Sequence, residues 1–255
     1  MAVSDALVVG EDWISEHYFT TDAAKESFLA RVLERRKEWE ALEKPADSGT
    51  PPTPTPRSRF RAERSRLAEL LAALPAEGSE SLTGAALEAA EQLDALLREI
   101  LGFTSPEYRL VERGPVSLVR PVSDEGPAPL ALLRARPVTT VEDLLVKDAP
   151  TLAEVWEPVD LADPGAPALE GAEPVESVSR ALSTLMTDEH GPAFALVLAG
   201  QWALIAERER WPEGRWLAVN VQLVVERHEM TRGGEVERAL TCLDARSLVP
   251  TAEGE

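Results

Sequence analysis

The sequence predicts an α/β protein in which a group of helices precedes a mixed β-sheet and packs on it. Three observations lead to this prediction. Apolar residues recur at helical spacing through the first 101 residues, short β-prone runs replace that period after Gly102, and one further helical segment separates two groups of strands. The chain has 255 residues, of which 44% are hydrophobic, which is enough to bury a large core.

The first third of the chain is predicted to be helical, with one proline-rich break. We expect helices over Asp22–Lys44 with Asp22 as N-cap, over Ser58–Leu74, and over Thr83–Leu101 with Gly102 as C-terminal cap. Between the first two, "KPADSGTPPTPTPRSR" contains five prolines, which cannot continue a helix. The sequence therefore predicts a helical region over 1–101, with an extended, mobile linker at about 45–57, followed by an α/β domain over 102–255.

The remainder is predicted to begin with a three-strand antiparallel meander, "EYRLVER", "VSLVRPV" and "PLALLRARPV", joined by turn residues. Pro174 is expected to open a helix, followed by strands "AFALVLAG" and "QWALIAER" joined at Gly200. The alternation in "RWLAVNVQLVVER" (Arg215–Arg227) predicts one strand, and a helix is expected over Gly234–Leu243. Residues 139–173 are acidic and rich in proline, so we expect a long loop with a helical turn near Val141–Leu145 and an edge segment near Leu152–Val159.

Charge is distributed unevenly along the chain. The net charge is −19, and Glu142–Glu176 contains ten acidic residues against Lys147 alone, whereas Arg57–Arg66 contains five arginines and one acid. If the protein meets nucleic acid, the acidic stretch should face away from it and the arginine segment should contact phosphates. The alternative is that these arginines, Arg57, Arg59, Arg61, Arg64 and Arg66, form the solvated face of a helix.

Several classes of protein are disfavoured by composition. Cys242 is the single cysteine and the three histidines are scattered, so neither an internal disulfide nor a structural zinc site is expected. The sequence has no apolar run of about 18 residues and no signal-peptide pattern at its start, so we expect a cytoplasmic protein. Phosphate-binding loops of the Walker type, dinucleotide-binding glycine motifs and methylation motifs are also missing from the sequence.

The order helix, three-strand meander, helix, strand, strand resembles the core of PD-(D/E)XK nucleases. Such a site needs carboxylates that hold Mg²⁺ and a lysine beside the attacking water, and one strand typically carries them as Glu-Ala-Lys-Pro. Here the strand reads Arg134-Ala135-Arg136-Pro137. A guanidinium neither coordinates a metal cation nor acts as a base. We therefore expect a degenerate nuclease-like sheet with no catalytic residues and no metal site.

Two interpretations of Arg134 and Arg136 remain open. They form a phosphate-binding face, or they are solvent-facing residues paired with Asp124, Glu125 or the acidic loop. Arg232 raises a similar choice, because the glycines that follow it let backbone amides approach a phosphate or simply form a turn before a helix.

Two stretches, "GEDWISEHYFTTDAAKESFLARVLERRKEW" and "GRWLAVNVQLVVERHEMTRGGEVERALTCLDARSL", resemble the N-terminal region of large bacterial, chiefly actinobacterial, DNA methyltransferases of the type IIG restriction–modification or phage-defence kind. The resemblance implies that this chain is the leading, nuclease-like domain of such a protein. It also implies that adenine-N6 methylation, with S-adenosylmethionine as cofactor, belongs to the remainder of the parent.

We therefore expect a non-catalytic domain that positions duplex DNA or docks the methyltransferase domain. One alternative is a protein-interaction scaffold that contacts the rest of its parent or another defence subunit through exposed tryptophans such as Trp13, Trp39 or Trp156. Another is an active Mg²⁺-dependent endonuclease whose carboxylates come from elsewhere, for example Glu142 or Asp143.

Overall fold

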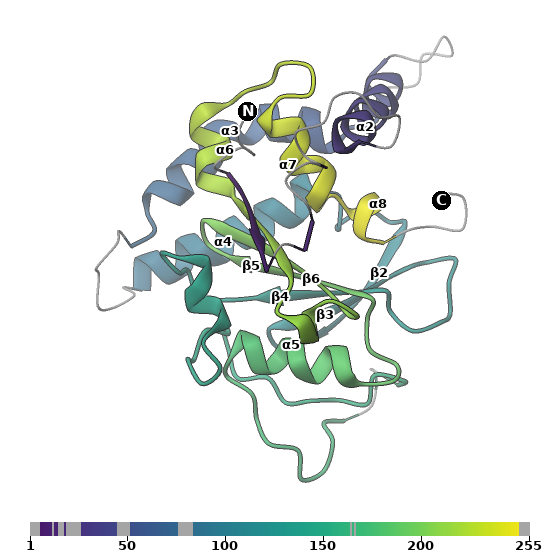
Figure 1. The fold of residues 1–255 in the computed structure, drawn as a ribbon, viewed down its shortest axis with the longest axis vertical. Helices are drawn as coiled ribbons and strands as arrows, with labels where there is room; N and C mark the ends of the chain where they lie inside the picture. The colour runs from purple at the N-terminus through teal and green to yellow at the C-terminus, as the bar shows by residue number, and fades with distance from the viewer. Residues whose placement is uncertain are drawn as a thin grey trace.

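A computed structural model describes residues 6–11, 13–14, 18, 27–44, 52–75, 84–163, 165 and 167–249. Its centre is a mixed sheet that has seven strands within these residues, in the order β1-β7-β6-β5-β4-β3-β2 (Figure 1). Helices lie on both faces of this sheet (Figure 1). The predicted α/β class is confirmed.

The strands are β1 (Leu7–Gly10), β2 (Tyr108–Arg113), β3 (Val116–Pro121), β4 (Leu130–Arg134), β5 (Phe194–Ala199), β6 (Trp202–Glu207) and β7 (Trp216–Asn220). Neighbouring strands are antiparallel except β4 and β5, which are parallel. A parallel pair needs a long crossover connection. The chain between β4 and β5 provides it through the acidic stretch Glu142–Glu176, called the acidic segment below, and one helix. The predicted meander β2-β3-β4 and the β5-β6 hairpin at Gly200 are both present.

The α-helices are α2 (Phe28–Leu42), α3 (Pro56–Ala72), α4 (Gly84–Ile100), α5 (Val178–Thr187), α6 (Val221–Arg227), α7 (Glu235–Leu243) and α8 (Ala245–Leu248). Two short 3₁₀ helices, η1 (Val141–Leu145) and η2 (Trp211–Glu213), lie in the connections, and η1 confirms the helical turn expected there. Within the described ranges, none of the helices has both the length and the apolar character that crossing a bilayer requires.

The sheet separates two hydrophobic cores. Along β4, Leu130 and Leu132 face the core built with α2, α3, α4, α6 and α7, whereas Ala131 and Leu133 face the core built with α5 and the acidic segment. This alternation follows from the two-residue period of a strand. Buried residues of the N-terminal helices and of the sheet therefore belong to one cluster in the first core.

The acidic segment is largely irregular, as predicted, and bridges at Leu152, Trp156 and Val159 confirm the expected edge segment, but its apolar residues are buried. Leu144, Leu152 and Trp156 are among the most completely buried side chains, and the segment pairs with the rest of the chain through bridges Ala135↔Leu152 and Trp156↔Val175. Its apolar residues therefore form part of the second core. The sequence concealed this because the buried residues are spaced irregularly between prolines and acids, without a helical or strand period.

Three predicted boundaries, the end of one strand and the starts of two helices, differ from the structure. Arg215–Arg227 is not one strand, because Asn220 ends β7 and its side chain accepts a hydrogen bond from the Leu223 amide at 3.0 Å, which caps α6. The crossover helix is opened by Ser177, rather than by Pro174, through a bond from the Arg180 amide. In α2 the N-cap is Ser27, whereas Asp22 lies outside the described residues.

The proline-rich segment ends in a helix cap. Residues 45–51 lie outside the described ranges, whereas the Thr53 amide donates to the Leu42 carbonyl at 3.0 Å. Thr55 and Ser58 form a capping box, with bonds of 3.2 and 2.9 Å between each side chain and the other residue's amide. Helix α3 therefore begins at Pro56, two residues before the predicted start, because a proline fits the first helical position.

Tyr108, at the start of β2, gives a pH-dependent prediction. Burial raises the pKa of its hydroxyl from 10.0 to about 12. Because the folded pKa is the higher one, the stability gained from the neutral phenol is complete below pH 10 and is lost as the pH rises toward 12. Spectrophotometric titration should show a tyrosine ionisation near pH 12 that is missing in Tyr108→Phe; an unchanged curve in that variant would contradict this assignment.

Candidate functional site

The two arginines of the "RARP" stretch lie where β4 ends. Arg134 occupies the last residue of β4 and Arg136 follows two residues later, on the strand face that carries Leu132. The Arg134 guanidinium donates to the carboxylate of Glu154 in the acidic segment and to the Gly114 carbonyl at 3.1 Å. Arg136 is exposed, and its amide donates to the Thr151 carbonyl at 2.8 Å. The contact with Glu154 agrees with the interpretation in which Arg134 pairs with the acidic segment.

Behind Arg134 lies a buried ion pair that the sequence did not single out. Arg98 Nε is 2.8 Å from Asp94 Oδ2 within α4, and Arg98 Nη1 donates to Ser117 Oγ on β3 at 3.2 Å. Burial raises the pKa of the Asp94 carboxyl, while Arg98 and then Arg134 act to lower it. The sequence could have indicated this ion pair only through the four-residue spacing of Asp94 and Arg98 among the apolar residues of α4.

These residues do not fit a divalent metal. Asp94, the buried carboxylate on which Arg134 acts electrostatically, is already paired with Arg98. Among the described residues, no group of three or more Asp, Glu, His or Cys side chains could hold a metal ion. Of the carboxylates considered as replacements, Glu142 is exposed, and Asp143 accepts a bond from the Thr140 amide at 3.2 Å.

The arginines of α3 separate into buried and surface groups. Arg57 is buried, and its guanidinium faces carboxylates on α2, after α2 and on α7, at 3.6 Å from Glu40, 3.6 Å from Glu43 and 3.7 Å from Glu237. Arg59 is half-buried and donates to the Glu99 carbonyl at 2.9 Å. Arg57 therefore belongs to the interior, and its guanidinium is not presented to a nucleic acid.

The surface group is centred on Arg61, Arg64 and His228. Arg64 Nε donates to the Val225 carbonyl of α6 at 3.2 Å, which fixes α3 against α6. The His228 ring stacks on Phe60 with 6.3 Å between ring centroids and 16° between planes. The pKa of His228 is lowered by burial and then by the charges of Arg64 and Arg61, so all three side chains share one positive field. Arg66, also on α3, is exposed.

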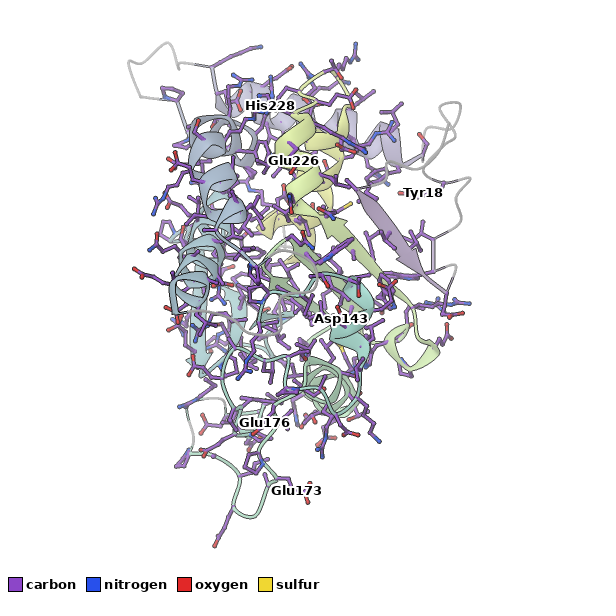
Figure 2. The ribbon with its side chains drawn as sticks, turned by 90° about the vertical axis from the view of Figure 1, so that its left-hand side faces the viewer. Tyr18, Asp143, Glu173, Glu176, Glu226 and His228 are labelled. Carbon is purple, nitrogen blue, oxygen red and sulfur yellow. The ribbon has the colours of Figure 1, made fainter. Side chains whose placement is uncertain are left out.

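The C-terminal part of the acidic segment lies at the opposite end of the molecule from this surface group, whereas Asp143 lies between the two ends (Figure 2). Figure 2 shows His228 near one end of the long axis and Glu173 and Glu176 near the other. Because the separation extends along the longest dimension of the chain, fields from these carboxylates are strongly screened at His228 at physiological ionic strength. The arrangement agrees with the expectation that the acidic stretch faces away from the arginine segment.

The glycines after Arg232 form a packed turn. The Gly233 amide, at φ +71°, donates to Glu237 Oε2 at 2.8 Å, and Arg238 Nε donates to the Gly233 carbonyl at 2.8 Å. A Cβ on Gly233 would lie 2.6 Å from Leu29 Cδ1, so α2 approaches too closely for any side chain. The amide that was considered for phosphate contact is thus directed at Glu237, whereas the Arg232 side chain is exposed.

Glu237 is the centre of a second buried network that the sequence did not reveal. Its side chain is completely buried, and its Oε1 is 2.7 Å from Arg36 Nη1 and 3.7 Å from Arg57 Nε. The carboxylate therefore joins α2, α3 and the turn before α7. A fully buried charge is tolerated only with such partners, so this network has a structural role.

No family model, no curated protein and no solved structure matches this chain. The chemistry of the site is therefore inferred from its geometry and from the sequence resemblance. That geometry joins Arg61 and Arg64 with His228, places Arg57 in the interior and pairs Arg134 with Glu154.

Proposed function

We propose that this chain is a non-cleaving, PD-(D/E)XK-like domain of a DNA restriction–modification or phage-defence methyltransferase, and that it positions duplex DNA through phosphate contacts. The order α4-β2-β3-β4-α5-β5, with β4 and β5 parallel around a crossover helix, supports the nuclease-like part of the proposal. The sequence resemblance supports the assignment to a methyltransferase parent.

The paired arginines support the non-cleaving part. Arg134 lies where a metal ligand would be required and is bound to Glu154, while Asp94 is bound to Arg98. Hydrolysis of a phosphodiester with Mg²⁺ needs free carboxylates at this point. No catalytic step is therefore assigned to this chain, and S-adenosylmethionine would be bound by the remainder of the parent protein.

The positive surface formed by Arg61 and Arg64 beside His228 is the observation that carries the DNA-binding part. Arginine presents a planar donor edge that suits phosphate oxygens. Both charges that act on His228 are positive, and Glu173 and Glu176 lie at the other end of the molecule (Figure 2). The large net negative charge opposes DNA approach elsewhere, so this surface also orients the bound duplex.

The scaffold alternative has less support. Trp39 and Trp156 are each 2% exposed and belong to opposite cores, so they do not form a shared contact surface. Trp13 is half-buried. If the chain does not bind DNA in the test below, the alternative is that it contacts the rest of its parent protein through other residues.

Replacing the exposed arginine of this surface, Arg61, tests the proposal. We expect the chain to shift a duplex of about 30 base pairs at low salt, and Arg61→Ala to weaken this binding about threefold to tenfold regardless of sequence, because one phosphate contact is lost. The slope of log affinity against log salt should fall by about 1 per lost contact. Arg57 is left unchanged because its removal would leave buried Glu237 with one fewer partner.

The matched control is Arg109→Ala, an exposed arginine on the edge strand β2. It removes the same charge from another part of the surface, so a specific α3 interface predicts little effect. Absence of any shift at low salt, or an equal loss in the control and the α3 variant, would overturn the DNA-binding proposal.

A further inference from the structure

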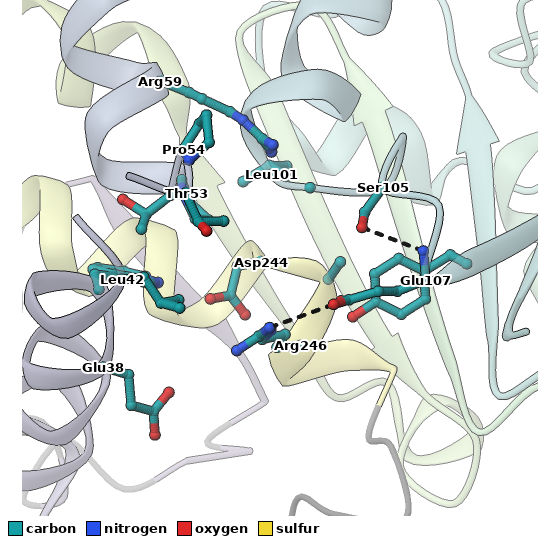
Figure 3. Close-up of a pocket in the computed structure, with 16 residues that line it drawn as sticks. Glu38, Leu42, Thr53, Pro54, Arg59, Leu101, Ser105, Glu107, Asp244 and Arg246 are labelled. Atoms are coloured by element: carbon teal, nitrogen blue, oxygen red, sulfur yellow. Dashed lines mark hydrogen bonds and ion pairs between the residues drawn. The ribbon is translucent and has the colours of Figure 1, made fainter. Parts of the chain in front are cut away.

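A pocket lies between the C-terminal end of α2, the chain that leads into α3, the end of α4 and the start of α8 (Figure 3). Its cavity volume is about 100 Å³, and Trp39, Leu42 and Leu101 supply apolar walls. The DNA-binding proposal makes no use of this pocket. It combines enclosure by apolar side chains with a few polar atoms, as small-molecule sites do.

Asp244 brings a buried carboxylate to the pocket. The residue is 2% exposed, and its Oδ1 accepts a hydrogen bond from the Ser247 amide at 2.7 Å, which caps α8. Its Oδ2 is buried with no hydrogen-bond partner among the described residues, and the nearest cation, Arg35, has its Nε 3.5 Å away. A buried carboxylate oxygen without a bonded donor is unusual and indicates that a donor binds there.

Tyr108 brings a second unpartnered oxygen to the same pocket. Its side chain lines the cavity, and its hydroxyl is buried without a hydrogen-bond partner in the part of the chain that the structure describes. Asp244 and Tyr108 both line this cavity, so the two buried oxygens without a hydrogen bond belong to one pocket. A hydroxyl accepts a hydrogen bond as readily as it donates one. The pocket therefore contains two acceptor positions.

The charges at the rim do not select an anion. Glu107 lies 3.7 Å from Arg246, and Arg35 is shared between Glu38 at 2.7 Å and Asp244 at 3.5 Å. Figure 3 shows Asp244 in the middle of the lining residues, between Leu42 and Arg246. Because the opposite charges at the rim offset one another, the buried acceptor oxygens decide which ligand fits.

We propose that this pocket binds a small planar ligand with an amidine-type N–C–N edge, which donates one N–H to Asp244 Oδ2 and the other to Tyr108 Oη. Amidines and guanidines share this edge of two N–H donors. A flat ring suits the apolar walls provided by Trp39 and Leu101, and the N–H groups supply hydrogen bonds that Asp244 Oδ2 and Tyr108 Oη do not receive from the described residues.

Titration calorimetry and protein NMR with three probes test this proposal. Benzamidine is expected to bind saturably with a dissociation constant near the millimolar range, as is usual for a ligand of this size. Benzoate has the same ring but an acceptor edge and is expected not to bind. 2-Aminopyrimidine presents one N–H donor and one ring-nitrogen acceptor on its N–C–N edge, so it is expected to bind more weakly than benzamidine.

Two variants locate the ligand. Asp244→Asn retains a side-chain oxygen for the α8 cap but places an N–H₂ donor at the second position, so benzamidine affinity should fall at least tenfold. Tyr108→Phe keeps the ring and removes the hydroxyl, and a loss of about threefold to tenfold is expected. The matched control is Asp160→Asn, because Asp160 also accepts a bond from a nearby amide, that of Ala162 at 2.9 Å, but on the surface.

Each binding result either supports or contradicts the proposed ligand site. Saturable benzamidine binding that both pocket variants weaken and Asp160→Asn leaves unchanged would support the site. Equal binding of benzoate, no saturation by either donor probe, or unchanged affinity in Tyr108→Phe would overturn it. Thermal unfolding is measured for each variant, and if Asp244→Asn fails to fold, the Tyr108→Phe result decides.

Discussion

Replacing Glu237 with alanine is expected to lower the free energy of unfolding by about 3–5 kcal/mol, the range found when one partner of a buried ion pair is removed. The carboxylate is completely buried, accepts from the Gly233 amide at 2.8 Å and lies 2.7 Å from Arg36 Nη1. Without it, two guanidinium groups, those of Arg36 and Arg57, lose a common counterion inside the protein.

Urea unfolding followed by far-UV circular dichroism measures this loss. Glu237→Gln is the informative intermediate, because it keeps an acceptor for the Gly233 amide while removing the charge, and it should be less destabilising than alanine. Glu226→Ala on the exposed face of α6 is the surface control, with an expected change within about 0.5 kcal/mol. A Glu237→Ala protein within about 1 kcal/mol of the parent would show that the network contributes little.

Helix periodicity was enough to find α2, α3, α4 and α7, because each places one apolar stripe against the sheet or a neighbouring helix. The β2-β3-β4 meander and the β5-β6 hairpin were likewise predictable from turn residues between β-prone runs. The prediction of one strand over Arg215–Arg227 was wrong at Asn220, where β7 is followed directly by α6. Val221, Val224 and Val225 are buried at helical spacing, but their β-branched side chains also fit a strand.

The candidate site was less predictable because burial depends on partners that are distant in sequence. Arg57 and Arg61 have the same side chain in the same run, yet only Arg57 is buried, where α7 supplies Glu237 to it. The contact of Arg134 with Glu154 could be anticipated only as pairing with the acidic segment in general. His228 offered no signal, because its position beside Arg61 and Arg64 depends on how α6 packs against α3.

The acidic segment leads to the second large stability prediction. Trp156→Ala is expected to destabilise the fold by about 3–5 kcal/mol, since removing a buried aromatic side chain loses its transfer free energy and leaves a cavity. Trp156 is 2% exposed and its backbone pairs with Val175 in both directions at 2.8 Å, beside the helix that crosses from β4 to β5. The expected loss is therefore that of a core residue, despite a local composition typical of a loop.

The neighbouring Val155→Ala provides the matched control, because Val155 is 50% exposed in the same segment and its truncation should change stability by no more than about 0.5 kcal/mol. Both variants are compared by urea unfolding with circular dichroism as the probe, since fluorescence would change with the loss of a tryptophan. Limited proteolysis adds a local readout: cleavage within 139–175 should accelerate in Trp156→Ala alone. If Trp156→Ala behaved like Val155→Ala, the segment would be a covering loop, and the second core would have to be stable without it.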